Sequence, residues 1–506
     1  MTNPLYDALF APHLGKQTPF IHVPDGQTLT HDAFLRMASK IAGALTEAGL
    51  VAGDRLALQV EKSPEALAVY AACVQKGIIF LPLNTAYTAV ELEYFIDNSG
   101  AKMVICDPSN ADSIAQITKR TGAALMTLVA SGAGSLMDAA SNQPETTETV
   151  ERSGDDLAAF LYTSGTTGRS KGAMLSQNNL LSNAEVLKDY WGFSKDDVLL
   201  HALPIFHTHG LFVASNIMLL SGGAMIFMRA FNPDTILTQM PNATSMMGVP
   251  TFYTRLLDHD GFSKESAAHM RLFISGSAPM LSETHEQFEA RTGQRILERY
   301  GMTETNMNTS NPYEGNRKAG TVGLPLPGIE VKVCDPESGA ELAQGEIGVL
   351  EVRGSNVFQG YWQMPEKTAE ELRKDGFFIT GDLGMIDDDG YVQIVGRGKD
   401  LIISGGYNIY PKEIELVIDD QPGVKESAVI GVPHPDFGES PVAVVVPEGD
   451  GPDIDQITEA CHAALARFKH PRKILICDAL PRNTMGKVQK NALRDEHSAL
   501  FANKES

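Results

Sequence analysis

The sequence predicts an α/β protein: a large N-terminal domain of mostly parallel sheets with flanking helices and a small β subdomain, then a small α+β C-terminal domain. Short apolar runs alternate with amphipathic segments through the first half of the 506 residues. Such alternation is typical of parallel strands covered by helices. From about residue 318, short strands and turn residues dominate, which indicates the β subdomain. A chain of this length exceeds one ordinary core, so at least two domains are expected.

The apolar pattern locates the strands and helices of the first half. Segments 63–77 and 89–100 have helical periodicity and each ends in glycine, as a helix C-terminus often does. Parallel sheets bind ligands at the carboxyl ends of their strands, so functional residues are expected directly after the strands. The predicted strands lie at 55–60, 78–83, 103–106, 158–164, 224–228, 245–249 and 271–277.

Two changes of composition mark the predicted domain limits. Residues 1–397 form the large domain, with the β subdomain at about 318–396, and residues 398–506 form the small one. Glycine and charge concentrate near residues 396–400, which we interpret as a linker. The polar segment 141–156 is the best candidate for a disordered loop.

The composition argues against several classes of partner. A formal net charge of −22 repels nucleic acid and anionic membranes. The five cysteines are scattered, as expected of reduced thiols in a cytoplasmic protein. The first residues lack the basic and apolar regions of a signal peptide. The most apolar stretch, 211–228, is interrupted by Ser221, Gly222 and Gly223, so a membrane span is not expected. The predicted partners are small molecules.

The segment LYTSGTTGRSKG, residues 161–172, is the strongest local signal of phosphate binding. It is not a Walker loop, because its glycines are too close together and Lys171 is followed by Gly172. Hydroxyl donors, glycines that permit close backbone approach, and one lysine still suit phosphate oxygens. The alternative is a flexible surface loop, since Gly, Ser and Thr are ordinary loop residues.

Four further motifs follow in the chain, and each is ambiguous alone. Tyr300 could pack in the core, Glu304 and Asp382 could be turn carboxylates, and Lys487 could be a solvated surface lysine. The motifs are ERYGMTET at 298–305, TGDLG at 380–384, GRGKDLI at 396–402 and PRNTMGKVQK at 481–490.

Taken in order, the five motifs resemble those of the adenylate-forming superfamily of acyl-CoA synthetases, luciferases and peptide-synthetase adenylation domains. The resemblance runs from about residue 20 to residue 495. It implies an enzyme that uses ATP, Mg²⁺ and coenzyme A, with a small C-terminal domain that rotates about a hinge. The segments FHTHGL, GVPTFYTRLL and ERYGMTETNMNTSNP resemble malonyl-CoA and methylmalonyl-CoA synthetases most.

The resemblance implies a nucleotide site. Tyr300 would stack on adenine, Asp382 would accept the ribose hydroxyls, and Arg397 would reach ribose or phosphate. Thr303 would touch the α-phosphate, Glu304 would bind Mg²⁺, and Lys487 would bridge the attacking carboxylate and the α-phosphate. The remaining implied residues are Thr163, Ser164, Gly165, Thr166, Thr167, Gly168 and Lys171 for the phosphates, and Gly276, Ser277, Ala278, Glu298, Arg299, Gly301 and Met302 for the rest of the nucleotide.

Thiolysis by coenzyme A needs a different arrangement, and the resemblance places the hinge at Lys399. The residues implied for coenzyme A are Ser404, Gly405, Gly406, Tyr407, Arg467 and Lys469. For the basic cluster at 466–473, a solvated helix end is the alternative. Lys487 is also an expected target of a protein lysine acetyltransferase and deacetylase, because acetylation would remove its charge.

A dicarboxylic substrate would bring a second carboxylate that needs a cation in the pocket. Arg229, after a predicted strand, is the leading candidate, with His207, His209 and Ser277 as helpers. Its alternative is a solvent-facing arginine at a strand end. Thr208 and Met307 would limit substituents at C2 of the acid. Two other functions remain open: ligation of another short or medium acid, and a nucleotide sensor without catalysis.

Overall fold

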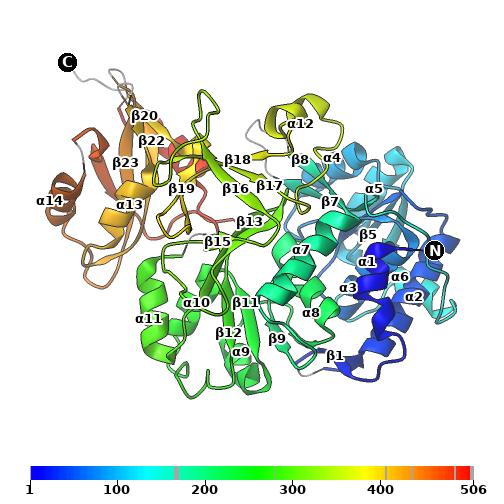
Figure 1. Ribbon diagram of the computed structural model, residues 1–506. Helices are drawn as coiled ribbons and strands as arrows, with labels where there is room; N and C mark the ends of the chain where they lie inside the picture. Colours follow the sequence, from blue (N-terminus) through cyan, green and yellow to red (C-terminus); the bar gives the residue numbers. More distant parts are fainter. Residues whose placement is uncertain are drawn as a thin grey trace. The chain divides into compact units, whose positions relative to one another are not determined.

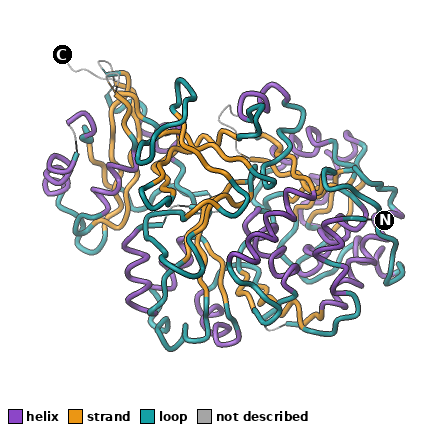
Figure 2. Tube along the Cα trace, viewed as in Figure 1, coloured by secondary structure: helices purple, strands orange, loops and turns teal. Residues whose placement is uncertain are grey.

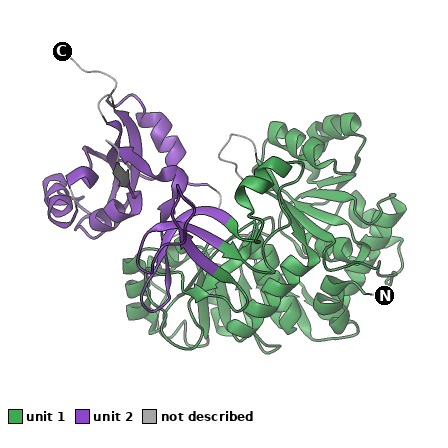
Figure 3. Cartoon of the chain, turned by 45° about the horizontal axis from the view of Figure 1, so that its top comes forward, with its two compact units in different colours: residues 1–276, 280–330, 352–378 green, residues 277–279, 331–351, 379–506 purple. Residues whose placement is uncertain are grey.

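The computed structural model describes residues 2–24, 26–163, 170–278, 280–404, 407–434, 437–465, 467–483 and 486–501. The chain divides into two compact units (Figure 3). The first comprises Met1–Gly276, Met280–Glu330 and Val352–Phe378, and the second comprises Ser277–Pro279, Val331–Glu351 and Ile379–Ser506. Part of the region predicted as a β subdomain therefore groups with the C-terminal residues. The linker near residue 397 stays a prediction.

The first unit contains a six-stranded sheet in the order β6-β5-β3-β4-β7-β8, parallel except for the β7–β8 pair. The strands predicted at 55–60, 78–83 and 103–106 are confirmed, and Gly77 and Gly100 end their helices with positive φ. The strands are β3 (Arg55–Gln59), β4 (Ile79–Pro82), β5 (Met103–Cys106), β6 (Ala124–Thr127), β7 (Leu157–Thr163) and β8 (Lys171–Ser176). The helices of this region are α2 (His31–Glu47), α3 (Pro64–Lys76), α4 (Ala89–Ser99), α5 (Ala111–Thr121) and α6 (Ser135–Ser141).

A nine-stranded sheet completes the first unit, in the order β15-β14-β13-β12-β11-β9-β10-β1-β2 (Figure 1). The six parallel strands, in their order in the sheet, are β13, β12, β11, β9, β10 and β1. Strands β2, β14 and β15 pair antiparallel at the edges. The strands are β1 (Pro19–His22), β2 (Thr28–Thr30), β9 (Val198–His201), β10 (Ala224–Phe227), β11 (Ser245–Gly248), β12 (Leu272–Ser275), β13 (Leu297–Met302), β14 (Asn306–Ser310) and β15 (Leu324–Pro325). Helices α9 (Pro233–Gln239), α10 (Pro250–Leu257), α11 (Ser282–Thr292) and α12 (Pro365–Glu371) belong to the same unit.

Three helices, α1 (Pro4–Leu9), α7 (Gln177–Tyr190) and α8 (Asn216–Ser221), pack on one another within this unit. Because α7 contacts both β8 and β14, it links the two sheets. The apolar stretch 211–228 is divided between a π-helix (His209–Ser215), α8 and β10, as its glycines predicted. No helix in the described part of the chain is long and apolar enough to cross a membrane.

The prediction of disorder at 141–156 is wrong. Most of the segment has no regular secondary structure, but α3 holds it by hydrogen bonds. Lys76 Nζ donates to the Thr147 hydroxyl at 2.8 Å and to the Glu148 carbonyl at 2.7 Å, and Val150 N–H donates to the Gln75 carbonyl at 2.9 Å. Composition alone did not reveal these partners, because they lie on a helix far away in the sequence.

The second unit combines short strands and helices, as predicted for an α+β domain (Figure 2). One sheet has the order β16-β17-β18-β19, and the other has the order β21-β20-β23-β22 with β24 beside β23. The strands are β16 (Glu330–Cys334), β17 (Gly348–Arg353), β18 (Phe378–Ile386), β19 (Val392–Arg397), β20 (Ile402–Ser404), β21 (Tyr407–Ile409), β22 (Val424–His434), β23 (Gly438–Pro447) and β24 (Lys473–Ile476). The helices are α13 (Pro411–Asp419), α14 (Ile454–Ala464) and α15 (Lys490–His497).

A buried lysine joins the two sheets of the first unit. Lys62 follows β3, and its ammonium donates to His201 Nδ1 and to the carbonyls of His201 and Leu203, each at 2.8 Å. His201 Nε2 faces the Gly210 carbonyl at 2.8 Å, so Nε2 carries the ring proton and Nδ1 accepts. Burial lowers the pKa of Lys62 well below its ordinary value. The loop after β9 is therefore tied to the end of β3.

We expect Lys62→Met to lower the free energy of unfolding by about 2–4 kcal/mol, because buried acceptors lose their donor. Urea unfolding followed by tryptophan fluorescence reports on the first unit, since Trp191 and Trp362 both lie in it. The control is Lys195→Met at an exposed position, with an expected change within about 0.5 kcal/mol. Equal stabilities of the two variants would contradict this role for Lys62.

Candidate active site

The ends of the Gly-Ser-Thr segment are held by a β-hairpin. Thr163, the last residue of β7, pairs with Lys171, the first residue of β8. Gly172 is required here, because a Cβ at this position would lie 2.0 Å from the Phe160 ring. The predicted phosphate-binding residues Ser164, Gly165, Thr166, Thr167 and Gly168 lie outside the described residues.

The Lys171 side chain is buried and paired. Its ammonium lies 3.0 Å from both carboxylate oxygens of Glu371, at the end of α12, and 4.1 Å from the centre of the Tyr361 ring. Lys367 also contacts Glu371, at 3.0 Å. Burial alone would raise the pKa of Glu371, but hydrogen bonds from Tyr361 and both lysines hold it below its usual range. Glu371 is therefore an anion at neutral pH.

Glu304 lies on the same network. Its Oε1 is 3.3 Å from the Thr163 hydroxyl and 3.1 Å from the Tyr361 hydroxyl. The Tyr361 hydroxyl is also 2.6 Å from Glu371 Oε2. Burial and the two carboxylates raise the pKa of Tyr361, so the phenol keeps its proton. The structure thus brings together Thr163, Lys171 and Glu304, three of the predicted site residues.

The aromatic motif occupies β13 and the turn after it. Tyr300 is half-buried, whereas Glu298 is buried and its Oε1 lies 3.3 Å from His285 Nδ1 on α11. Burial raises the pKa of Glu298 against the opposing effect of His285. Gly301 must lack a side chain, because a Cβ there would lie 1.8 Å from the Asn306 carbonyl. Met302 ends the strand.

Arg299 is the buried cation of this motif. It is 3% exposed, and its Nε and Nη2 make no hydrogen bond to any residue that the structure describes. Burial lowers the pKa of Arg299 to about 9, so it remains charged at neutral pH. Gly276 makes room for it, since a Cβ at Gly276 would lie 2.4 Å from Arg299 Cζ. Of the other residues predicted beside Gly276, Ser277 has a φ of 71°, and Ala278 is half-buried next to it.

A small polar pocket lies at the carboxyl ends of β4 and β7. Thr303 and His207 line it together with Tyr162 and Phe206. Burial lowers the pKa of His207 to about 4, so its ring is neutral. The buried ring of His209 lies near Arg299, and burial together with the charge of Arg299 lowers its pKa well below the ordinary value.

Thr208 and Met307 lie on neighbouring segments. The Thr208 hydroxyl donates to Asn306 Oδ1 at 2.7 Å, and Met307 is the next residue along β14. Met307 is 1% exposed, and its backbone is held by Asn183 through hydrogen bonds of 2.8 and 3.2 Å. These two predicted wall residues are therefore brought together.

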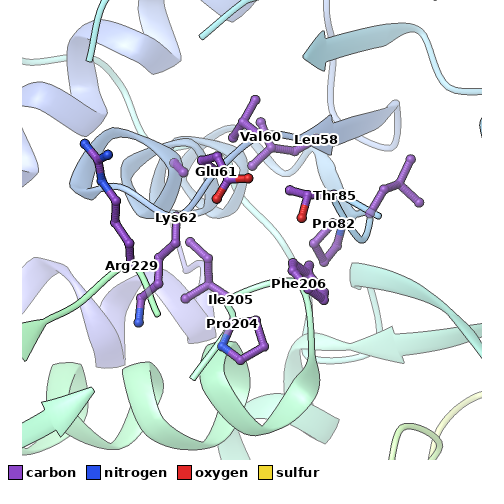
Figure 4. Close-up of a pocket in the computed structure, with 12 residues that line it drawn as sticks. Leu58, Val60, Glu61, Lys62, Pro82, Thr85, Pro204, Ile205, Phe206 and Arg229 are labelled. Atoms are coloured by element: carbon purple, nitrogen blue, oxygen red, sulfur yellow. The ribbon is translucent and has the colours of Figure 1, made fainter. Parts of the chain in front are cut away.

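Arg229 does not join this group. It is exposed, donates to the Ala130 carbonyl at 3.3 Å, and lines a second pocket that also contains Lys62 and Phe206. In Figure 4, Arg229 and Phe206 stand at opposite sides of this pocket. The alternative described for Arg229, a solvent-facing arginine after a strand, fits this position.

The second unit holds its own group of predicted residues. Asp382 on β18 is the cross-strand neighbour of Arg397 on β19, and Arg397 Nε lies 2.7 Å from Asp382 Oδ1. Lys487 N–H donates to Asn483 Oδ1 at 3.0 Å. Burial, with smaller contributions from Arg397 and Lys399, lowers the pKa of Lys487 to about 8, and Asp382 and Asp400 oppose this shift. Lys487, Asp382 and Arg397 are thus close enough to influence one another.

The other predicted residues of this unit are spread over several elements. Lys399 lies in a 3₁₀ turn at Gly398–Asp400. Ser404 ends β20 and Tyr407 begins β21, whereas Gly405 and Gly406 lie outside the described residues. Arg467 and Lys469 share a 3₁₀ turn, and Lys469 pairs with Glu413 at 2.8 Å. The pairing of Lys469 does not distinguish a coenzyme A site from a solvated turn.

Three residues of these networks were not predicted from the sequence: Tyr361, Glu371 and Lys62. None of them lies in a motif with a recognisable spacing. The only signal was the charge of Glu371 at the end of a short polar segment, which is ordinary for a surface helix.

Comparisons with known proteins bear on the whole chain. The model of the AMP-binding enzyme family matches residues 12–362, and that of the AMP-binding enzyme C-terminal domain matches residues 413–487. A feruloyl-CoA synthase of Amycolatopsis is 36% identical over 474 residues, which cover 93% of this chain and 94% of the relative. A malonate–CoA ligase of Arabidopsis thaliana is 33% identical over 480 residues, which cover 88% and 78%.

The crystal structure of ATP-bound MatB from Rhodopseudomonas palustris has a TM-score of 0.97 to this chain and 56% sequence identity, covering 99% of this chain and 100% of that one. The predicted fold and the resemblance to adenylate-forming enzymes are confirmed. The relatives' names differ in the acid, so the family does not by itself identify the substrate. The first family model spans more than half of the chain, and this chain therefore belongs to the AMP-binding enzyme family.

Proposed function

We propose that the protein is an ATP-dependent ligase that joins malonate to coenzyme A through a malonyl-adenylate, releasing pyrophosphate and then AMP. Methylmalonate is expected to serve as well. The observation that carries the choice of acid is Arg299, a buried guanidinium with unpartnered nitrogens among the described residues. The likeness to ATP-bound MatB and to a malonate–CoA ligase supports the same reaction.

A dicarboxylate suits Arg299 for electrostatic reasons. One carboxylate of malonate must react, and the other stays ionised inside the pocket. Burying that charge without a partner is prohibitive, and so is burying the guanidinium alone. Arg299 replaces Arg229 in this role, because Arg229 is exposed and donates to the Ala130 carbonyl, whereas Arg299 is buried near the ring of His209.

Activation of the acid needs fixed positive charge. A carboxylate is a poor acylating agent, and attack on the α-phosphorus of ATP displaces pyrophosphate and converts the acid into a mixed anhydride, the acyl-adenylate, whose AMP leaves readily. Negative charge from both reactants gathers in this transition state. Lys487 would supply a cation to it, Asp382 and Arg397 would bind the ribose, and Lys171 would hold the phosphates.

Glu304 fits a magnesium ion. It is a buried carboxylate beside the Thr163 hydroxyl, and Mg²⁺ favours oxygen ligands and takes few from protein when phosphates supply the others. When bound, Mg²⁺ would neutralise phosphate charge during attack. Thr303 and Tyr300 would hold the α-phosphate and adenine next to Glu304.

Thiolysis requires Lys487 to leave and a thiol to enter. Rotation about Lys399 would achieve this exchange, and the segment from Ser404 to Tyr407, with Arg467 and Lys469, would face coenzyme A. Acetylation of Lys487 by a protein acetyltransferase would stop the first step by removing the charge. A deacetylase would restore it.

An acid panel tests the function. Malonate, methylmalonate, succinate, acetate and a fatty acid are each incubated with ATP, Mg²⁺ and coenzyme A, and AMP is measured. We expect malonate to have the highest kcat/KM. A preference for acetate or a fatty acid would refute the malonate assignment and leave a synthetase for another acid. No AMP with any acid would favour a nucleotide sensor.

Arg299→Ala should lower kcat/KM for malonate by an amount that corresponds to roughly 2–5 kcal/mol of activation free energy, because it leaves a buried charge unpaired. Acetate has no second carboxylate, so its kcat/KM should fall far less. Steady-state kinetics with both acids measure the change in preference. Arg229→Ala is the matched control and should leave the malonate-to-acetate ratio unchanged; the reverse result would restore Arg229 to the role.

Lys487→Ala should abolish pyrophosphate release and leave thiolysis of supplied malonyl-adenylate largely intact, because only the first step needs this cation. The two half-reactions are assayed separately. Similar losses in both would rule out the assigned role.

The first half-reaction should also slow as pH rises through about 8, the pKa of Lys487. Below that pH the amine carries its proton and its charge, and above it the charge is lost. Pyrophosphate release is measured from pH 6 to pH 10 for the wild type and for Lys487→Arg, whose guanidinium stays charged. A falling limb that persisted unchanged in Lys487→Arg would belong to another group.

A further inference from the structure

One side-chain network connects the lysine expected to face the ATP phosphates with the carboxylate expected to face Mg²⁺. Glu371 holds the Lys171 ammonium through both carboxylate oxygens, each at 3.0 Å. The Tyr361 hydroxyl lies 2.6 Å from Glu371 and 3.1 Å from Glu304. All four residues belong to the first unit, so their arrangement is independent of the second unit.

Hydrogen counting shows how Glu371 orients Lys171. An ammonium has three hydrogens, and the contacts to Oε1 and Oε2 of Glu371 use two of them. The Tyr361 ring, 4.1 Å from Nζ, covers another side of the group. The remaining hydrogen is available for an oxygen of a phosphate. Glu371 and Tyr361 therefore restrict the orientation of the Lys171 ammonium.

Hydrogen counting at Tyr361 has a different result. One hydroxyl hydrogen lies between two carboxylates, so it can be donated fully to only one of them. Glu371 is nearer, and Glu304 receives a further contact from Thr163 at 3.3 Å. A cation bound at Glu304 would relieve the repulsion between Glu304 and the Tyr361 oxygen. Binding at Glu304 and the geometry at Glu371 are thus coupled through one hydroxyl.

We propose that Glu371 and Tyr361 are positioning residues that tie Lys171 to Glu304, so that helix α12 sets the affinity for magnesium-ATP. This inference rests on the proposed function, in which Lys171 and Glu304 face the nucleotide and its metal. Glu371 is not expected to contact the nucleotide or the metal. It acts through Lys171 and, by way of Tyr361, through Glu304.

The test measures binding by calorimetry, with Mg²⁺ and α,β-methylene-ATP, which cannot be cleaved between its α and β phosphorus atoms. Glu371→Gln keeps the shape of the side chain and removes its charge. We expect the dissociation constant of the magnesium complex to rise about tenfold to hundredfold, as for other partners of metal and phosphate ligands. Tyr361→Phe keeps the ring under Lys171 and should raise the half-saturating Mg²⁺ concentration.

The double variant separates a network from two local effects. If the two residues act as one unit, Glu371→Gln with Tyr361→Phe should weaken binding no more than the worse single change. Multiplied losses would overturn the coupling. In steady-state kinetics, KM for ATP should rise, whereas KM for malonate and the rate of thiolysis should stay within about twofold.

Glu370→Gln is the matched control. Glu370 is the neighbouring residue, its side chain is 65% exposed, and it contacts Lys367 at 2.8 Å rather than Lys171 or Tyr361. Its substitution should leave nucleotide binding and melting temperature unchanged. An equal effect of Glu370→Gln and Glu371→Gln would overturn the proposal.

Tighter binding by Glu371→Gln would also overturn it, because Glu371 would then compete with phosphate for Lys171. If the wild-type protein bound the analogue but did not activate malonate, the assignment of malonate as substrate would be refuted. The comparison of variants would still test the positioning role of Glu371 and Tyr361. A wild-type protein that did not bind the analogue would refute both proposals.

Discussion

The geometry of the first unit depends on the hydrogen bonds that the buried Lys62 ammonium donates. The ammonium lies between the end of β3 in one sheet and the end of β9 in the other, and no carboxylate neutralises it among its described partners. Three oriented acceptors replace water around it, and Phe227 covers it at 4.2 Å. The loop after β9, which carries His207 and Thr208, therefore has its first residues fixed.

The candidate site follows the same physical rule, which is that buried charge must have partners. Lys171 and Glu371 neutralise each other, and Glu304 lies within hydrogen-bonding distance of the Tyr361 and Thr163 hydroxyls. Arg299 departs from the rule among the described residues, since two of its nitrogens lack acceptors. A group left in this state is costly to the fold, and a ligand that supplies the missing acceptors recovers that cost.

The sequence predicted the parallel architecture well, because uninterrupted apolar strands and glycine-ended helices are local signals. It also predicted that Thr163, Lys171 and Glu304 would belong to one site. It could not separate Arg229 from Arg299, because both adjoin strands and only packing decides which one is buried. The order in segment 141–156 and the contacts of Glu371 depend on partners far away in the chain, which composition does not encode.

Arg299 and Tyr300 are neighbours on β13, and successive side chains of a strand face opposite sides. Arg299 is buried and Tyr300 is half-buried, and the two side chains lie on different faces of β13. In the proposed function, a side chain on one face of this strand binds the acid and a side chain on the other face binds the nucleotide. The two functions can then evolve separately. A substitution at position 299 can alter the choice of acid, while the binding of ATP and the adenylation chemistry are retained.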